Sequence, residues 1–207
     1  MSDLTSSGIL EAYGTDRLPL VKETEHFSYT GITVVECPPV HLAVISSGDP
    51  IPFEDMPKVF NQVDEHGDFV TRHGLRRATD SPIEWLYHNE AEQAADPGGN
   101  PVRAPFLFEA GHQIEKPAQP AEEPSATFGK FVTTELRPLR VARTFYQGSF
   151  PYQSNSGFVE AWMRLVTERE AQGYDLTFRL YRELYHDLDW ENPEKSITEI
   201  QVEIVEV

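Results

Sequence analysis

"TELRPLRVARTFYQG", from Thr134 to Gly148, repeats an earlier part of the same chain. The earlier copy is "VECPPVHLAVISSG", from Val35 to Gly48, and one residue inserted near the end of the later copy aligns the two. At an offset of 99 residues the alignment pairs identical residues: Glu36 with Glu135, Pro39 with Pro138, and Ala43 with Ala142. After the proline, each stretch alternates apolar positions and then ends at glycine, which is typical of a strand that leads into a turn. These two stretches predict an internal repeat.

Two shorter blocks support the repeat. "EWLYHN" at 84–89 matches "RELYHD" at 182–187 with an offset of 98 residues, and "FEAGHQI" at 108–114 matches "TEIQVEI" at 198–204 with an offset of 90. The last offset is shorter because the first copy has about eight additional residues before this block, within segment 89–105. The order of the blocks is the same in both copies.

Between the first and second blocks, each copy has apolar residues at helical spacing. In the first copy we expect Asp55 to cap the helix and Pro57 to occupy its first turn. In the second copy the pattern follows "SNS", and we expect Gly173 to end the helix. The apolar sets are Met56, Val59, Phe60 and Val63 in the first copy, and Phe158, Ala161, Trp162, Leu165 and Val166 in the second, with Trp162 interpreted as a core residue. Each copy therefore reads strand, helix, strand, strand.

The domain organisation follows from the repeat. We predict an α+β fold made of two pseudo-symmetric modules with antiparallel sheets, preceded by an N-terminal extension at 1–26. The modules span 27–114 and 127–207, and segment 115–126, rich in proline and charge without periodicity, is interpreted as the linker between them. Because one helix covers only one face of a small sheet, two modules side by side would leave a shared central cleft for a ligand.

The stretch "YRELYHDL" at 181–188 points to a site in that cleft. In a strand, residues two apart share a face, so Tyr181, Glu183 and Tyr185 would line one side. The other side, which we expect to face the helix, comprises Phe178, Leu180 and Leu184. A carboxylate between two tyrosines is either part of a binding site or a surface acid paired with a nearby cation. The candidate cations for that pairing are Arg179, Arg182 and Arg143.

The composition of the 207 residues disfavours several classes of partner. A net charge of -17 and a pI near 4.7 argue against nucleic acid and anionic membranes, which most of this surface would repel. The same acidity favours cations, or simply solubility. Cys37 is the only cysteine, so a disulfide within the chain is excluded. No signal peptide and no apolar run of membrane-spanning length is present, and we expect a cytoplasmic protein.

The motifs, taken together, resemble a known family. "FEAG" closes the first copy, "FYQGSFPY" precedes the second helix, and "ELY" and "TEIQVEI" follow in order. In this the chain resembles the GyrI-like small-molecule-binding family, the effector domains of multidrug-sensing transcription regulators, from about Phe27 to Val207. The resemblance implies two similar SHS2-like modules around a central pocket. Those regulators attach the domain to a helix-turn-helix, for which 26 residues are too few, so we expect a stand-alone binding domain.

The resemblance also implies the site. In the family an acid in the "E-x-Y" strand meets lipophilic cations, and by position this acid is Glu183, with Tyr185 beside it. The corresponding residues of the first copy are Trp85 and Tyr87. The predicted ligand-binding set is Glu183, Tyr185, Tyr181, Trp85, Tyr87, Phe106, Phe108, Tyr146, Tyr152 and Trp190. The expected partners are hydrophobic or cationic small molecules, without a cofactor.

Other interpretations stay open at this stage. Some GyrI-like proteins hydrolyse strained electrophilic rings, and Glu183 with Tyr185 would serve that chemistry as well. Inhibition of a protein partner is suggested only by the family name. By periodicity alone the aromatic residues of the first copy belong to the core. The nearest histidines, His66 and His73, lie in an expected loop without metal-ligand spacing, so no metal site is predicted. Glu109 and Glu199 occupy equivalent positions and are expected to bind backbone or cap strands.

Overall fold

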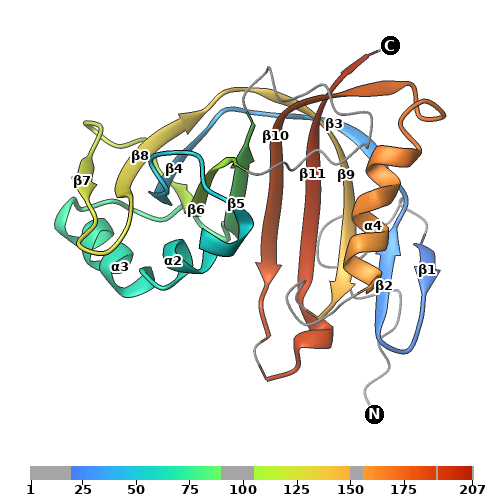
Figure 1. The fold of residues 1–207 in the computed structure, drawn as a ribbon, viewed down its shortest axis with the longest axis horizontal. Helices are drawn as coiled ribbons and strands as arrows, with labels where there is room; N and C mark the ends of the chain where they lie inside the picture. Colours follow the sequence, from blue (N-terminus) through green and yellow to red (C-terminus); the bar gives the residue numbers. More distant parts are fainter. Residues whose placement is uncertain (1–19, 90–104, 150–155, 190, 207) are drawn as a thin grey trace.

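The computed structural model describes residues 20–89, 105–149, 156–189 and 191–206 (Figure 1). The elements of the first copy and its flanks are β1 (Leu20–Glu23), β2 (Phe27–Thr30), β3 (Thr33–Cys37), β4 (Val40–Ser46), η1 (Phe53–Asp55), α2 (Met56–Phe60), α3 (Val63–Arg72), β5 (Ile83–His88) and β6 (Leu107–Ile114). Those of the second are β7 (Glu122–Pro124), β8 (Lys130–Leu136), β9 (Leu139–Gly148), α4 (Ser156–Thr167), β10 (Tyr174–Asp187), η3 (Pro193–Lys195) and β11 (Ile197–Glu206). The predicted α+β class is confirmed.

The strands of both copies form one continuous antiparallel sheet, where we expected a separate sheet in each module. Its order is β1-β2-β9-β11-β10-β5-β6-β4-β8-β7, with β3 also paired to β9. The two copies pair through β4 with β8 and through β2 and β3 with β9, and they also meet where β5 of the first pairs with β10 of the second. This pairing satisfies the edge strand of each copy, which would otherwise leave a row of backbone donors and acceptors unpaired. The candidate site therefore lies on a shared sheet surface.

The sheet is strongly curved. β8 and β9 are separated by six steps in the strand order, about 29 Å across a flat sheet, yet only residues 137 and 138 connect them in the chain. Those residues span at most about 11 Å, so the sheet must bend until β8 and β9 approach each other. β3, which pairs with β9, is joined to β4 by an equally short connection. In Figure 1 both connections arch over one end of the sheet.

The curved sheet has an inner, concave face and an outer, convex face. The helices cover the outer face. α4 packs on β9 and β2, α2 on β6, and α3 on β4. One apolar cluster joins helix residues such as Val59, Phe69 and Leu165 to sheet residues such as Phe108 and Ile200. Figure 1 shows β10 and the adjacent part of β11 between α4 and the α2–α3 pair. The face inside the curve carries a second apolar cluster around Leu42, Leu86, Leu139 and Leu180.

The helix expected after Asp55 is broken into two. α2 ends at Phe60, and α3 begins at Val63 after a turn in which the buried Gln62 donates a hydrogen bond from Nε2 to the Lys58 carbonyl, 2.9 Å away. Because of this turn, the helical spacing of α2 does not continue into α3. Val63, which we predicted to be buried on the apolar face, is therefore 66% exposed. His66, predicted to lie in a loop, is a buried residue of α3. Asp55 makes no capping bond with its side chain.

The helix of the second copy has the predicted apolar stripe but a different end. Phe158, Ala161 and Leu165 of α4 are buried. The helix ends at Thr167, and Gly173 instead occupies the turn before β10 with a φ of +75°. This is a left-handed backbone conformation that glycine adopts without a steric penalty.

The predicted orientation of β10 is wrong. Tyr181 faces α4 and the main apolar cluster, whereas Leu180 belongs to the cluster on the other face. The reason is a register shift in the pairing with β11, between Leu176 and Tyr181, which turns the following side chains over. Leu184, two residues beyond Leu180, shares its face, and the Phe178 side chain lies outside the described part of the structure. The site and the helices are thus on the same face of the sheet.

Two segments predicted to flank the modules join the sheet. β1 lies within the predicted N-terminal extension and pairs with β2. β7 lies within the predicted linker and pairs with β8, and Ala121 just before it is buried. Among the described residues, no helix has the length and apolar character needed to cross a bilayer.

Candidate functional site

Glu183 is buried at the centre of three tyrosine hydroxyl groups. Tyr181 and Tyr87 donate hydrogen bonds to Oε1 over 2.9 and 3.2 Å, and Tyr185 donates to Oε2. Only 4% of Glu183 is exposed. Burial raises the pKa of Glu183 to about 7, although the three tyrosine hydrogen bonds counteract part of this effect. The carboxyl group therefore changes its charge near neutral pH.

The strand pairing explains how the sequence builds this cluster. Tyr181 and Tyr185 lie two residues on either side of Glu183 on the same face of β10. In the β5–β10 pair, Tyr181 is opposite Tyr87 and Glu183 is opposite Trp85. The Trp85 and Tyr185 ring centroids are 4.6 Å apart. The residues that the sequence repeat made equivalent, Glu183 and Trp85, are therefore neighbours across one strand pair.

The surface interpretation of Glu183 is wrong. Arg182 points to the other face of the sheet and pairs with Glu84, and Arg143 pairs with Glu199. Among the described residues, no basic side chain forms an ion pair with Glu183. Its negative charge is therefore compensated only by neutral hydroxyl groups, which is a costly state for a buried carboxylate without a ligand.

A small cavity opens beside Glu183, between α4 and η1. Its volume is about 200 Å³, and it is lined by Phe53, Tyr87, Phe158, Val159, Trp162, Tyr181 and Glu183. The Trp162 and Tyr181 rings meet edge to face with centroids 5.7 Å apart. Phe53 and Val159 are exposed at its rim. Aromatic rings around one carboxylate form a site suited to a cation.

A larger cavity lies further along the same strands, against α2 and α3. Its volume is about 610 Å³, and it is lined by Ile45, Phe60, Val63, His66, Gly67, Arg77, Ile83, Trp85, Ala110, Gly111, His112, Tyr185 and Leu188. Phe60 stacks on Trp85 with ring centroids 4.3 Å apart. Burial lowers the pKa of His66, and burial together with His66 and Arg77 lowers the pKa of His112 to about 4. Both imidazoles are therefore neutral at pH 7.

The remaining predicted site residues take other places. Phe108 and Phe106 are fully buried and contact the Tyr87 ring, at centroid distances of 5.1 and 5.4 Å, and neither is among the lining residues of the two cavities. Tyr146 packs against Phe158 in the core of the second copy and is absent from the lining of both cavities. Tyr152 and Trp190 lie outside the described residues.

Trp162, Phe53 and Phe60 line the cavities but were not predicted as site residues. Trp162 was assigned to the core because it belongs to the apolar stripe of its helix. Ala161 and Leu165 occupy the buried centre of that stripe, and Trp162 lies at its edge, half-buried. Helical spacing does not distinguish the centre from the edge. For Phe53, the sequence signal is its position between two prolines in "PFEDMP", and its 46% exposure at the rim is seen only in the structure.

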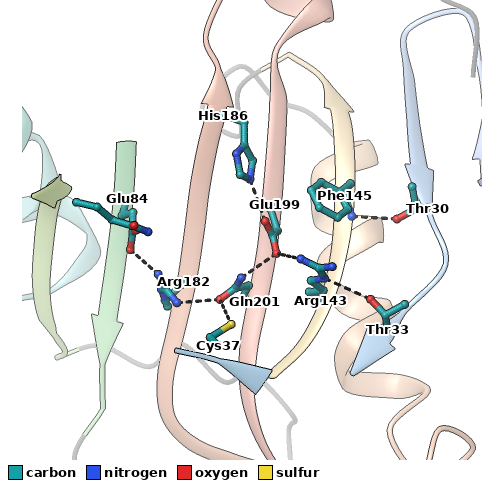
Figure 2. Close-up of polar contacts among 11 residues, drawn as sticks. Thr30, Thr33, Cys37, Glu84, Arg143, Phe145, Arg182, His186, Glu199 and Gln201 are labelled. Atoms are coloured by element: carbon teal, nitrogen blue, oxygen red, sulfur yellow. Dashed lines mark hydrogen bonds and ion pairs between the residues drawn. The ribbon is translucent and has the colours of Figure 1, made fainter. Parts of the chain in front are cut away.

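The inner face of the sheet carries a buried polar network (Figure 2). Arg182 donates hydrogen bonds to Glu84 at 2.6 Å and to Gln201 at 3.0 Å, and Gln201 donates to Glu199 at 2.8 Å. Glu84, Arg182, Gln201 and Glu199 are all buried by the curvature of the sheet, since no helix covers this face in the described structure. The network lies behind Glu183 and occupies a different face.

Glu109 and Glu199 bind side chains, whereas we expected them to bind backbone or cap strands. His88 pairs with Glu109 at 3.1 Å, and His186 pairs with Glu199 at 2.9 Å, in equivalent positions of the two copies. Burial alone would raise the pKa of Glu199, but hydrogen bonds from His186 and Gln201 and the charge of Arg143 lower it to about 2. Within the described ranges, no group of three or more acidic, histidine or cysteine residues could hold a metal ion.

Comparisons with known proteins identify the fold. The scan against family models and the search of curated proteins find no match. The C-terminal domain of EcmrR has a similar structure, with a TM-score of 0.61 and 19% identity over 86% of this chain and 98% of that one. SAV2435, solved with tetraphenylphosphonium bound, has a TM-score of 0.55 and 15% identity over 84% and 94% of the two chains. A hydrolase encoded by lin2189 from Listeria innocua has a TM-score of 0.50 and 14% identity over 84% and 91%.

These structures share the arrangement of the present chain over most of their length. At such low identity the similarity concerns the fold. The chain therefore shares its fold with these proteins, and its sequence motifs resemble those of the GyrI-like family.

Proposed function

We propose that this chain binds hydrophobic, aromatic and often cationic small molecules with broad specificity, as a cytoplasmic sensor or sequestering protein. The observation that carries the proposal is the carboxylate of Glu183. It lines a cavity walled by aromatic rings and has no basic partner among the described residues. A buried acid in this state gains most from a ligand that brings a positive charge.

The energetics favour cations over neutral compounds of similar shape. At about 4 Å and an effective dielectric constant near 20, a cation and the carboxylate attract each other by ~4 kcal/mol, from which desolvation subtracts a part. Each aromatic face adds ~0.5 to 2 kcal/mol. Neither contribution demands a particular ligand shape, because charge attraction is not directional and the rings offer flat surfaces. Binding of tetraphenylphosphonium by SAV2435, a protein of the same fold, supports this choice of ligand.

Affinity for a permanent cation should rise with pH. The carboxyl group with a pKa of about 7 is protonated at pH 6 and ionised at pH 8, and the cation binds the ionised form. We therefore expect tetraphenylphosphonium to bind about tenfold more tightly at pH 8 than at pH 6, with little further change above pH 8. His112, with a pKa of about 4, stays neutral throughout this range. Calorimetric titration at several pH values measures the effect.

A neutral aromatic compound is the control for the pH series, because its affinity should not rise between pH 6 and 8. Glu183→Gln should abolish the pH dependence for the cation. An equal rise in the natural protein and in this variant would contradict the proposal, since the titrating group would then be another residue.

Hydrolysis of strained rings is the second candidate, and the pairing of Glu183 with Tyr185 favours it. An acid with a pKa of about 7 in direct contact with a tyrosine hydroxyl is suited to proton transfer. For an epoxide, Glu183 would accept a proton from water as the water oxygen bonds to a ring carbon. The carbon–oxygen bond of the ring breaks, and its oxygen takes the proton of Tyr185, which recovers one from Glu183. The net change is the addition of water.

Incubation with a panel of epoxide- and cyclopropane-bearing aromatic compounds tests this reaction. If the chain is a hydrolase, mass spectrometry should find products heavier than a substrate by one water, formed faster than in buffer and lost with Glu183→Gln. If no compound of the panel is converted faster than in buffer, the binding function stands alone.

A further inference from the structure

The two cavities have different linings and different chemistry, and one hydrogen bond connects a residue of each. The smaller contains Glu183, while Tyr185, which donates a hydrogen bond to that carboxylate, lines the larger. The larger cavity has no acidic residue in its described lining. Arg77, a basic residue of that lining, would repel a positively charged group of a ligand. One cavity therefore suits a cation, and the other suits an uncharged group.

The cavities follow each other along the β5–β10 pair. Tyr181 and Tyr87 lie opposite each other at the smaller cavity, and Tyr185 and Ile83 lie opposite each other at the larger one. Tyr181 and Tyr185 are four residue steps apart along the extended strand, a distance of about 13 Å. An elongated molecule lying parallel to the strands would pass Glu183 and reach into both cavities.

The volumes point the same way. Ligand pockets usually measure about 300 to 1,000 Å³. The larger cavity, at about 610 Å³, is in this range, whereas the smaller, at about 200 Å³, holds only part of a ligand. The aromatic side chains of Phe60 and Trp85, which stack on each other, and of Tyr185 line the larger cavity and offer ring surface to a ligand. His66, which also lines this cavity, is buried, and its Nε2 atom has no hydrogen-bond partner among the described residues.

We propose that the ligand has two parts, a compact cationic head in the smaller cavity and a neutral, flat aromatic body with a hydrogen-bonding edge in the larger cavity. The head is held by Glu183 and the Trp162 ring. The body lies against Trp85, with its polar edge toward His66 and His112. This inference rests on the proposed binding function and specifies the class of compound. Broad specificity then means that the larger cavity accepts different aromatic bodies, whereas the smaller cavity requires a positively charged head.

Three probes test the inference by calorimetric titration: benzyltrimethylammonium as the head, 2-naphthamide as the body, and 2-naphthamide carrying a trimethylammoniopropyl group on its amide nitrogen as the linked compound. Joining two groups that bind at once turns the second contact into an intramolecular one. We expect the linked compound to bind at least about a hundredfold more tightly than either part.

Variants in each cavity assign the parts. A Cβ atom added at Gly67 of α3 meets no atom within 4 Å, so Gly67→Phe can fill the larger cavity without a backbone clash. It should weaken the linked compound by about tenfold or more and leave the head probe unchanged. Asp68→Phe, at the exposed neighbouring position of the same helix, is the matched control for the added ring. Trp162→Ala should weaken the head and the linked compound about tenfold, and Trp162→Phe should restore most of the affinity.

The outcomes separate this inference from the proposed function. A linked compound that binds no more tightly than its head and is insensitive to Gly67→Phe overturns the two-part ligand. The binding function survives that result if Glu183→Gln still weakens the head probe. If the affinity of the head probe does not depend on Glu183, the binding function itself fails, and the two-part ligand with it.

Discussion

Replacing Glu183 with glutamine should weaken the binding of a lipophilic cation such as tetraphenylphosphonium ten- to a hundredfold at pH 8. The change removes one negative charge and keeps the shape of the side chain. The expected loss of ~1.5 to 3 kcal/mol is the Coulomb attraction remaining after desolvation of the carboxylate. Equilibrium titration of both proteins measures it. Affinity within a factor of two of the natural protein would contradict the electrostatic argument.

The stability of the same variant distinguishes a lost site from a lost fold. Because burial raises the pKa of Glu183 from 4.5 to about 7, its ionised form destabilises the folded protein. This carboxyl group stabilises the fold most below pH 4.5, and its contribution is lost as the pH rises through about 7. Glu183→Gln should therefore be at least as stable as the natural protein at pH 8 in urea unfolding. A large loss of stability would show that the tyrosine hydrogen bonds outweigh the cost of the buried charge.

Replacing Arg182 with methionine should destabilise the fold by ~3 to 5 kcal/mol, the largest effect expected in this chain. Arg182 forms an ion pair with Glu84, whose exposed fraction is 0%, and bonds Gln201 as well. Without the guanidinium group, Glu84 keeps its hydrogen bond from Gln113 but has an uncompensated charge inside the curved sheet. Urea unfolding followed by tryptophan fluorescence at pH 7 measures the loss.

The double variant Arg182→Met with Glu84→Gln is the control. Removing both charges leaves neutral groups of similar volume, so we expect it to recover a substantial part of the lost stability. If the double variant is as unstable as Arg182→Met, the loss of stability comes from packing. The uncompensated charge of Glu84 would then not be its cause.

The proximity of the side chains around Glu183 could be predicted in part from local sequence. The alternation along a strand places Tyr181 and Tyr185 on the same side as Glu183 whatever the rest of the fold does, because residues two apart share a face. The repeat predicts two more members of this cluster, Trp85 and Tyr87, because they align with Glu183 and Tyr185 of the second copy. The structure brings all five residues together on the β5–β10 pair.

The role of Trp162 and the shape of the cavities could not be predicted this way. A helix position is assigned to the core by spacing, but whether it lies over another side chain or over an empty volume depends on how the helix sits on the sheet. The break between α2 and α3 is a similar case. It places His66 and Gly67 at the larger cavity, and it arises from the turn at Gln62, to which the apolar pattern gave no clue.

The sequence by itself determined the repeat, the α+β class and the acid with its flanking tyrosines, since these depend on short-range spacing and on similarity between two segments. Only the tertiary structure decided which face of β10 carries the site, because the register shift between Leu176 and Tyr181 arises from pairing with β11. It also decided that both copies share one curved sheet. That curvature buries Glu84 and Arg182 on the inner face, whereas Glu183 lines the smaller cavity on the outer face.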